Sequence, residues 1–175
     1  KNRTFSPAQL DQQARFALAV EHLSPLTPLL NVTFKGFAKK KSAFNSAVSY
    51  TIENAITGTY PNYTIDWSKF VISRGKLPLA QQVRATPTTD EIEFEWSNTG
   101  MSQPALGSDR AIMVVFCPEL KRFEYTWTGS FRMSESASIM VSNFRGKVVH
   151  TWIGFISDDY KRISDSMYTG QMTVV

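Results

Sequence analysis

Glu91-Ile92-Glu93-Phe94-Glu95-Trp96 is the stretch that decides the fold of the second half of the chain. Its apolar and acidic residues alternate strictly, and this period of two is typical of a β-strand with one face in the core and one face in water. The three glutamates share the wet face. Carboxylates on one face of an edge strand usually prevent unwanted pairing, so we interpret them in this way rather than as paired acids or a calcium site.

Apolar and alternating runs continue to the end of the chain, and turn residues separate them. Ala111-Ile112-Met113-Val114-Val115-Phe116 is apolar throughout, as expected for a central strand that is buried on both faces. Further strand-like runs lie near residues 123–127, 137–141, 147–156 and 163–174. Roughly seven short strands with regular turns predict an antiparallel β-sandwich in the second half.

The first half has the period of helices. Ser6-Pro7-Ala8-Gln9 combines a capping serine, a proline suited to the first turn and a glutamine at the capping-box position. Apolar residues then recur at helical spacing until Ser24-Pro25, where the proline ends the helix. After one short turn, a second helix is expected from about Ser42 to Thr57-Gly58. Together these helices predict a helical hairpin.

The apolar stripe of this hairpin must be buried, and the sequence leaves its cover open. The segment Tyr63-Thr64-Ile65-Asp66-Trp67, the sandwich and a second copy of the protein are the alternatives. Residues 70–78 are predicted to form a strand and a turn, and we place a domain boundary after Pro78. The chain is therefore expected to be an α+β protein, with a helical hairpin and a short strand extension in residues 1–78 and a sandwich in residues 79–175.

Two stretches resemble fibronectin type III modules. A Pro-containing entry, residues 83–90, leads into the alternating strand, and Trp96 lies where such modules place a core tryptophan. Residues 149–159, followed by residues 164–168, are similar to the last two strands of the module and their polar hairpin. The resemblance implies an immunoglobulin-like sandwich, a fold that usually holds partners or spaces other domains.

Over nearly its whole length the chain also resembles family 6266 of domains of unknown function, which comes from Bacteroidota-type bacteria. The resemblance is carried by stretches such as Leu23-Ser24-Pro25-Leu26, Ile72-Ser73-Arg74-Gly75 and His150-Thr151-Trp152-Ile153-Gly154-Phe155. It implies no catalytic or binding residue. Its members usually begin with a Gly-rich basic segment, and this chain has neither that segment nor an initiator methionine, so we expect a trimmed chain.

The charge is uneven along the chain. Residues 1–78 carry ten Lys/Arg and four Asp/Glu, a net charge of +6, whereas residues 79–175 carry nine and eleven, a net charge of −2. This asymmetry places any affinity for anions in the first half. Lys39, Lys40 and Lys41 directly precede the second helix, where backbone donors also attract anions, and they are the candidate anion-binding residues. A solvated loop is the alternative.

Aromatic residues provide the second candidate site, a ligand-binding surface. If the odd-numbered residues of 149–155 face the core, His150 and Trp152 face outward, and Tyr125 and Trp127 can share their surface. Exposed aromatic rings suit sugar stacking or a protein hot spot. The opposite register buries Trp152, and the helical hairpin covering these rings is a further alternative.

The sequence shows no assembled catalytic or metal-binding motif. Its only cysteine, Cys117, follows an apolar run and is interpreted as a buried thiol. His22 and His150 lack the spacing of metal ligands, and neither a nucleophile elbow nor a phosphate loop is present. We therefore predict no enzyme, no metal and no cofactor.

A non-enzymatic binding or structural module that acts through protein contacts, with a protein partner or another copy of itself, is our leading interpretation. A secreted or cell-surface location is favoured over a cytoplasmic one. The alternative is a carbohydrate-binding accessory module that uses exposed aromatic rings. An enzyme of unrecognised type and a nucleic-acid binder are further alternatives, of which nucleic-acid binding is unlikely. No run reaches the ~18 apolar residues of a membrane-spanning helix, so no transmembrane segment is expected.

Overall fold

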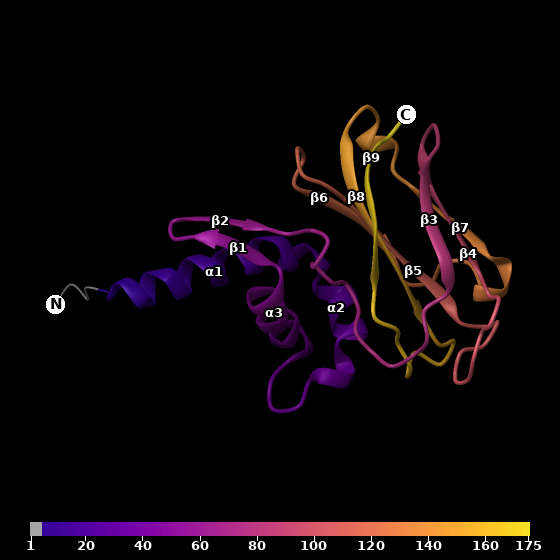
Figure 1. Ribbon diagram of the computed structural model, residues 1–175, viewed down its shortest axis with the longest axis horizontal. Helices are drawn as coiled ribbons and strands as arrows, with labels where there is room; N and C mark the ends of the chain where they lie inside the picture. Colours follow the sequence, from indigo (N-terminus) through magenta and orange to yellow (C-terminus); the bar gives the residue numbers. More distant parts are fainter. Residues whose placement is uncertain (1–4) are drawn as a thin grey trace.

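The computed structural model describes residues 5–175, which form three stacked layers (Figure 1). A helical layer packs on one face of a four-stranded sheet, and a three-stranded sheet packs on the other face. Neighbouring strands are antiparallel in both sheets. The expected α+β fold, with an N-terminal helical region and a C-terminal antiparallel sandwich, is therefore confirmed.

The helical layer begins where the capping signals predict. Within residues 5–175 it contains the helices α1 (Pro7–Leu23), α2 (Thr27–Thr33) and α3 (Ala43–Asn54), with single 3₁₀ turns at Ser24–Leu26 (η1) and Lys35–Phe37 (η2). Ser6 and Gln9 form the expected capping box at the start of α1. The Ser42 hydroxyl accepts a hydrogen bond from the N–H of Asn45 and caps α3. No helix among these residues is long and apolar enough to cross a membrane.

The end of α3 differs from its prediction, because Thr57 and Gly58 lie in a strand. This strand, β1 (Ile56–Thr59), pairs with β2 (Asn62–Ile65) in a two-stranded hairpin that contacts α1. Gly58 has a φ of +94°, and a Cβ atom there would lie 2.4 Å from the carbonyl oxygen of Asn62. The tight hairpin, and not a helix end, is therefore what requires glycine at this position.

The strand expected after residue 70 is absent from this part of the described chain. Residues 66–80, the linker, connect β2 to the sandwich without forming a regular strand. The backbone N–H groups of Ile72 and Ser73 point to the hydroxyl oxygen of Ser166, at 2.9 and 3.4 Å. A side chain thus replaces the neighbouring strand as their hydrogen-bond acceptor, which explains why an extended apolar segment stays outside both sheets.

Seven strands build the sandwich in the described chain. One sheet has the order β3-β4-β7 and the other the order β6-β5-β8-β9. The strands are β3 (Gln81–Pro87), β4 (Glu91–Ser97), β5 (Arg110–Cys117), β6 (Arg122–Thr126), β7 (Ser136–Met140), β8 (Val148–Ile156) and β9 (Met167–Thr173), with 3₁₀ turns η3 (Arg132–Ser134) and η4 (Ser142–Phe144). The resemblance to fibronectin type III modules remains a prediction.

Strand β4 lies in the middle of its sheet, so our assignment of its glutamates to an edge strand is wrong. It pairs with β3 on one side and with β7 on the other. Glu95 is partly buried and lies 2.6 Å from the guanidinium of Arg84 on β3. The glutamates do occupy the solvent side of the strand, since Phe94 and Trp96 are buried in the core between the sheets. Here the acidic face pairs across strands instead of protecting an edge.

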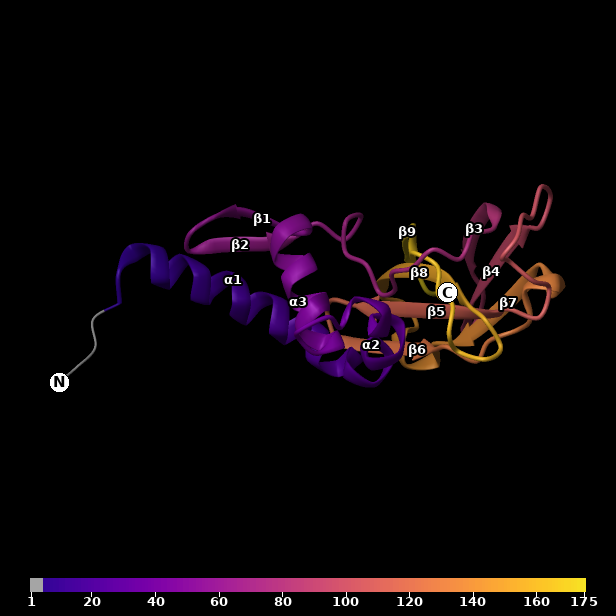
Figure 2. The same cartoon turned by 90° about the horizontal axis from the view of Figure 1, so that it is seen from below.

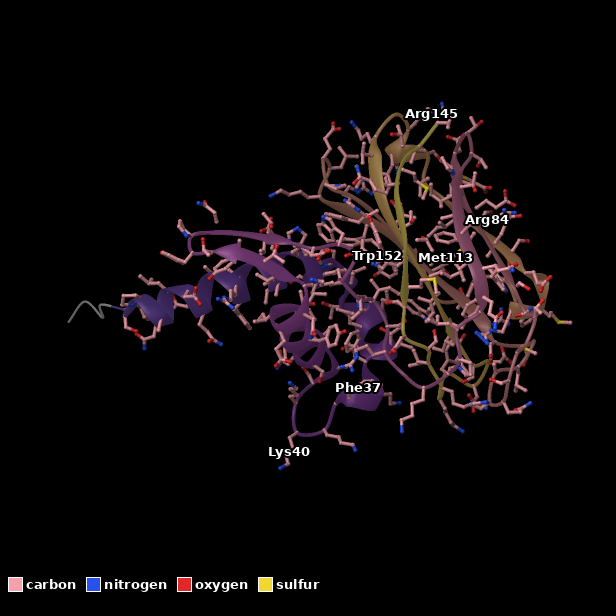
Figure 3. All side chains as sticks on the ribbon, in the orientation of Figure 1. Phe37, Lys40, Arg84, Met113, Arg145 and Trp152 are labelled. Carbon is pink, nitrogen blue, oxygen red and sulfur yellow. The ribbon has the colours of Figure 1, made fainter. Side chains whose placement is uncertain are left out.

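The two central strands of the larger sheet are buried on both faces. Met113 and Val115 of β5 pack between the sheets, whereas Ile112 and Val114 of the same strand pack against the helices. Figure 3 shows this division, with Met113 on the side of the three-stranded sheet and Trp152 on the side of the helices. Figure 2 shows α2 and the end of α1 beside β5 and β6. The run 111–116 is thus a central strand, as expected.

A hydrophobic core therefore crosses the boundary that the sequence suggests. Leu23, Leu29 and Phe34 of the helical layer belong to the same buried cluster as Phe116 and Trp152 of the sandwich. Of the three covers left open for the helical stripe, two contribute: the sandwich, with Ile112 and Trp152 in the same cluster, and the segment 63–67, from which Ile65 and Trp67 pack against it. The division into residues 1–78 and 79–175 remains a prediction, but its two parts share one core.

We expect replacement of Trp152 by alanine to lower the free energy of unfolding by about 3–5 kcal/mol. The ring is fully buried, and its Nε1–H donates to the Phe70 carbonyl oxygen at 2.9 Å, so the change creates a cavity and leaves an acceptor unpaired. Trp127, which is half-buried, is the matched control, and its replacement by alanine should cost about 1 kcal/mol. Urea unfolding curves test this prediction, and equal losses for both variants would contradict it.

Candidate functional site

A pocket of about 540 Å³ opens where the helical layer, the linker and the sandwich meet. We call it the basic pocket, because five cationic residues from three separate segments line it: Lys39, Arg74, Lys76, Lys161 and Arg162. Its remaining lining is largely apolar and includes Phe37, Leu77, Pro104 and Ile163. We call the apolar part of this lining the apolar floor and the five cationic residues the cationic rim.

The linker forms one wall of the basic pocket by running close to the chain after β8. The Leu77 N–H donates to the carbonyl oxygen of Ile163 at 2.9 Å. The Gly75 N–H donates to the Asp165 carboxylate at 3.1 Å. A Cβ atom on Gly75 would lie only 1.9 Å from the Ile163 carbonyl oxygen. This approach requires glycine, and it places the side chains of Arg74 and Lys76 beside the pocket.

Two of the five cations are held in place by neighbouring groups. The Arg74 guanidinium lies between two aromatic rings, 4.4 Å from the centre of the Phe37 ring and 4.3 Å from that of Tyr50. These cation–π contacts attach the linker to the helical layer. Arg162 donates to the Pro104 carbonyl oxygen at 3.0 Å. The positions of both guanidinium groups are therefore set before any ligand arrives.

The electrostatic balance of the basic pocket is strongly positive. None of the described residues that line it is acidic. Within residues 5–175, no carboxylate oxygen lies within 4.0 Å of the charged nitrogens of the pocket's other four cations, whereas Lys161 lies 3.6 Å from Asp159. Hydrogen bonds from Ser157 and from the Lys161 backbone hold the pKa of Asp159 below its ordinary value, so this carboxylate stays ionised. An anion is the ligand that such a site attracts.

The structure separates the three lysines that the sequence grouped as anion-binding. Lys39 lines the basic pocket. Lys40 is exposed on the loop before α3 (Figure 3) and does not line the pocket. The Lys41 Nζ donates to the Ser49 hydroxyl of α3 at 3.0 Å and lies beside a smaller hollow. Only Lys39 joins the larger site, because consecutive residues in a loop point in different directions.

The four residues of the predicted ligand-binding surface have different surroundings. His150 and Trp152 do lie on the outer face of the four-stranded sheet, as the first of the two registers requires. The helical layer and the linker cover that face, so Trp152 has no exposed surface and His150 is 8% exposed. An accessible surface that includes these two rings is therefore a wrong expectation. Tyr125 and Trp127 are half-buried, and a ligand at Trp127 stays a prediction.

Sequence reasoning missed four of the five cations. Arg74 and Lys76 flank a glycine, and Lys161 follows a turn directly before Arg162, so each pair resembles ordinary solvated charge. The signal that could have indicated these residues is a pair of basic residues in a loop. Such a pair occurs twice, in segments about 85 residues apart in the chain. The contacts of Gly75 with Asp165 and of Leu77 with Ile163 bring the two pairs together.

His150 lies in an aromatic cluster beneath the linker. Its Nδ1 is 2.8 Å from the Tyr168 hydroxyl, and the centre of its ring is 5.3 Å from that of Trp67. Burial lowers the pKa of His150 below its ordinary value of 6.5, so the ring is neutral at pH 7. Among residues 5–175, no group of three or more His, Cys, Asp and Glu side chains is arranged to hold a metal ion.

His150 should make the protein sensitive to mild acid. The unfolded chain takes up a proton at this residue near pH 6.5, whereas the folded chain resists it, so stability is present above this pH and is lost as the pH falls toward the lowered pKa. The free energy of unfolding should fall by up to about 1.4 kcal/mol per pH unit in this window. Urea unfolding at about pH 7.5 and about pH 5.5 should show a smaller fall in the free energy of unfolding for His150→Gln than for the wild type. Because His22 is present in both proteins, an equal fall would contradict the prediction.

Replacement of Gly75 by alanine should distort the wall of the basic pocket. The added methyl group meets the carbonyl oxygen of Ile163, so either the linker or the segment of Ile163 must shift to make room. We therefore expect a loss of about 1–3 kcal/mol in the free energy of unfolding. Gly36 also lines the pocket, but a Cβ atom there meets nothing within 4 Å, so Gly36→Ala is the control and should change stability by less than about 0.5 kcal/mol. Thermal unfolding of both variants measures the difference, and a wild-type Tm for Gly75→Ala would refute it.

Comparison with known proteins identifies a family but no activity. No curated protein matches this chain. The model of one protein family, described as a family of unknown function (DUF6266), matches residues 2–170. That match covers nearly all of the helical layer, the linker and the sandwich, and the chain therefore belongs to this family.

Proposed function

We propose that this chain is a non-enzymatic binding module that holds a ligand with an acidic group in its basic pocket. The observation that carries the proposal is the convergence of five cations, from three segments of the chain, on one pocket with an apolar floor. The acidic group is a carboxylate, sulfate or phosphate that lies against the cationic rim. An apolar part of the same ligand packs on the floor formed by Phe37, Leu77 and Ile163.

The size of the pocket supports a role in binding. Its volume of about 540 Å³ lies within the range of roughly 300–1,000 Å³ that is usual for small-molecule sites. Sites of this kind combine apolar surface with a few placed polar groups, and here Arg74 and Arg162 are the placed groups. A charge-assisted hydrogen bond from a positioned guanidinium is roughly twice as strong as one between neutral groups.

The chemistry of the lining supports binding rather than catalysis. The described residues that line the basic pocket include no carboxylate, imidazole, hydroxyl or thiol side chain. General acid–base and nucleophilic catalysis usually depend on such groups or on a lysine amine, and the lysines here have no general base beside them in the described lining. A protein partner that presents an acidic side chain, in an assembly or at the cell surface, is one source of the bound group. Both the partner and the location stay proposals.

The fluorescent dye 8-anilinonaphthalene-1-sulfonate is a suitable first probe, because its rings fit an apolar floor and its sulfonate fits a cationic rim. We expect saturable binding to the folded protein, and we expect the double variant Lys39→Glu/Lys76→Glu to raise the Kd by about tenfold or more. The reason is that both reversed charges line the pocket and then repel the sulfonate. Fluorescence titration at low salt measures both values.

Lys40→Glu is the control for the Lys39→Glu half of the double variant, because it reverses one charge a residue away from Lys39 but outside the pocket. Its Kd should stay within about twofold of that of the wild type. Since the dye also binds loosely folded states, unchanged thermal unfolding must accompany each titration. Absence of saturable binding, or equal weakening by Lys40→Glu and by the double variant, would overturn the proposed function.

A further inference from the structure

A second hollow of about 280 Å³ lies between α2 and the turn that follows β8. We call it the aromatic hollow, because Trp127 and Tyr160 line it together with Asn31, Val32 and Lys35. Tyr160 is 44% exposed and Trp127 is half-buried, so parts of both rings face solvent. Asn31 and Lys35 are exposed beside them and offer amide and ammonium groups.

The aromatic hollow adjoins the basic pocket. Lys35 lines the hollow and the next residue, Gly36, lines the pocket. On the opposite side, Tyr160 lines the hollow and Lys161 lines the pocket. The same two segments therefore border both depressions, and because consecutive Cα atoms are about 3.8 Å apart, the backbone positions that border them are neighbours. A ligand of moderate length is long enough to reach from one depression to the other.

The Trp127 ring is held by a neighbouring ring, and the backbone of Tyr160 is held by its turn. The Trp127 ring stacks on Tyr125, with ring centres 6.2 Å apart and planes at 18°. Tyr160 belongs to a tight turn, in which its N–H donates to the Ser157 carbonyl oxygen at 2.8 Å and the Ser157 hydroxyl donates to Asp159 at 2.6 Å. A ring fixed in advance, as Trp127 is, loses little entropy when a ligand packs on it.

We infer that the two depressions form one composite site for an acidic sugar chain, an oligosaccharide with carboxylate or sulfate groups. This inference rests on the proposed function and names the class of ligand. A sugar ring presents an apolar face of C–H groups, which packs on Trp127 and Tyr160. Its hydroxyls can donate to or accept from the Asn31 amide and can accept from the Lys35 ammonium. The acidic group of a neighbouring sugar then lies in the basic pocket.

The arrangement of charge favours a sugar chain over single-stranded nucleic acid. Proteins that bind single strands place their cations along a groove that follows many phosphates. Here the five cations surround one pocket. Among the described lining residues of the aromatic hollow beside it, the only cation is Lys35. An acidic peptide would use the basic pocket in the same way, but it does not account for the pair of partly exposed rings beside it.

The experiment measures binding to the full chain by isothermal titration with five probes of similar length. These are a galacturonic acid hexamer, a sulfated heparin hexasaccharide, the neutral maltohexaose, a hexaglutamate peptide and a hexathymidylate oligonucleotide. We expect at least one acidic oligosaccharide to bind about tenfold more tightly than each of the other three classes. Heparin carries carboxylates as well as sulfates, so binding of the galacturonic acid hexamer indicates that carboxylates suffice, and binding of heparin alone indicates that sulfates are required.

Variants of the hollow test its part in the site. Trp127→Ala and Tyr160→Ala should each weaken binding of the preferred oligosaccharide by about tenfold and leave the Kd of the sulfonate dye within about twofold. Tyr60→Ala is the matched control, since Tyr60 is 49% exposed on the turn between β1 and β2 and lines neither depression, so it should change neither value. Tyr160 is exposed, so its variant tests the site even if Trp127→Ala unfolds.

The outcomes separate this inference from the proposed function. Dye binding at the basic pocket, with no acidic oligosaccharide preferred, overturns the inference and leaves the proposed function standing. Equal or tighter binding of hexaglutamate or hexathymidylate also overturns it, in favour of a peptide or a nucleic-acid ligand. Unchanged oligosaccharide affinity in both aromatic variants removes the hollow from the site. Loss of dye binding in the wild type overturns both.

Discussion

The outer face of the four-stranded sheet must be covered, and the rest of the structure depends on this constraint. Ile112, Val114 and Phe116 of β5 and Trp152 of β8 all present apolar side chains there. A continuous apolar surface of this kind promotes association when it faces water. The short helices need a partner as well, because most helical stability in proteins comes from packing an amphipathic face. Each part therefore completes the core of the other, and the linker closes the remaining gap with Phe70.

This cover creates a seam between helices and sandwich, and both depressions lie along it. The turn η2 comes from the helical side, and the turn after β8 comes from the sandwich side. Neither turn has to form a pocket by itself, because the space between two packed units supplies the concave surface. Side chains from distant parts of the chain meet at such junctions, and for this reason ligand sites are common there. The position of the site thus follows from the packing of the layers.

Gathering five cations around one pocket has an energetic cost, because like charges at short range repel one another. The fold offsets part of this cost. Two aromatic rings enclose Arg74, and Asp159 lies close to Lys161. The repulsion that remains favours any anion that enters, so ligand binding and protein stability are linked. A purely structural junction would gain from a mixture of charges at this place, and the lack of acidic residues in the described lining is therefore an argument for a ligand.

Local patterns in the sequence predict most of the elements but little of the site. The caps at Ser6 and Ser42 and the alternation along β4 each depend on a few neighbouring residues, so the sequence predicts them correctly. The alternation also places the Trp152 ring on the outer face, yet the helical layer and the linker, both far earlier in the chain, decide whether that ring is exposed to water. The same holds for charge. Lys39 was visible in a run of lysines, whereas Lys161 acquires meaning only when the linker packs beside Ile163. Types of chemistry are thus encoded locally, but the meeting of those groups is a long-range property of the fold, and a single sequence does not display it.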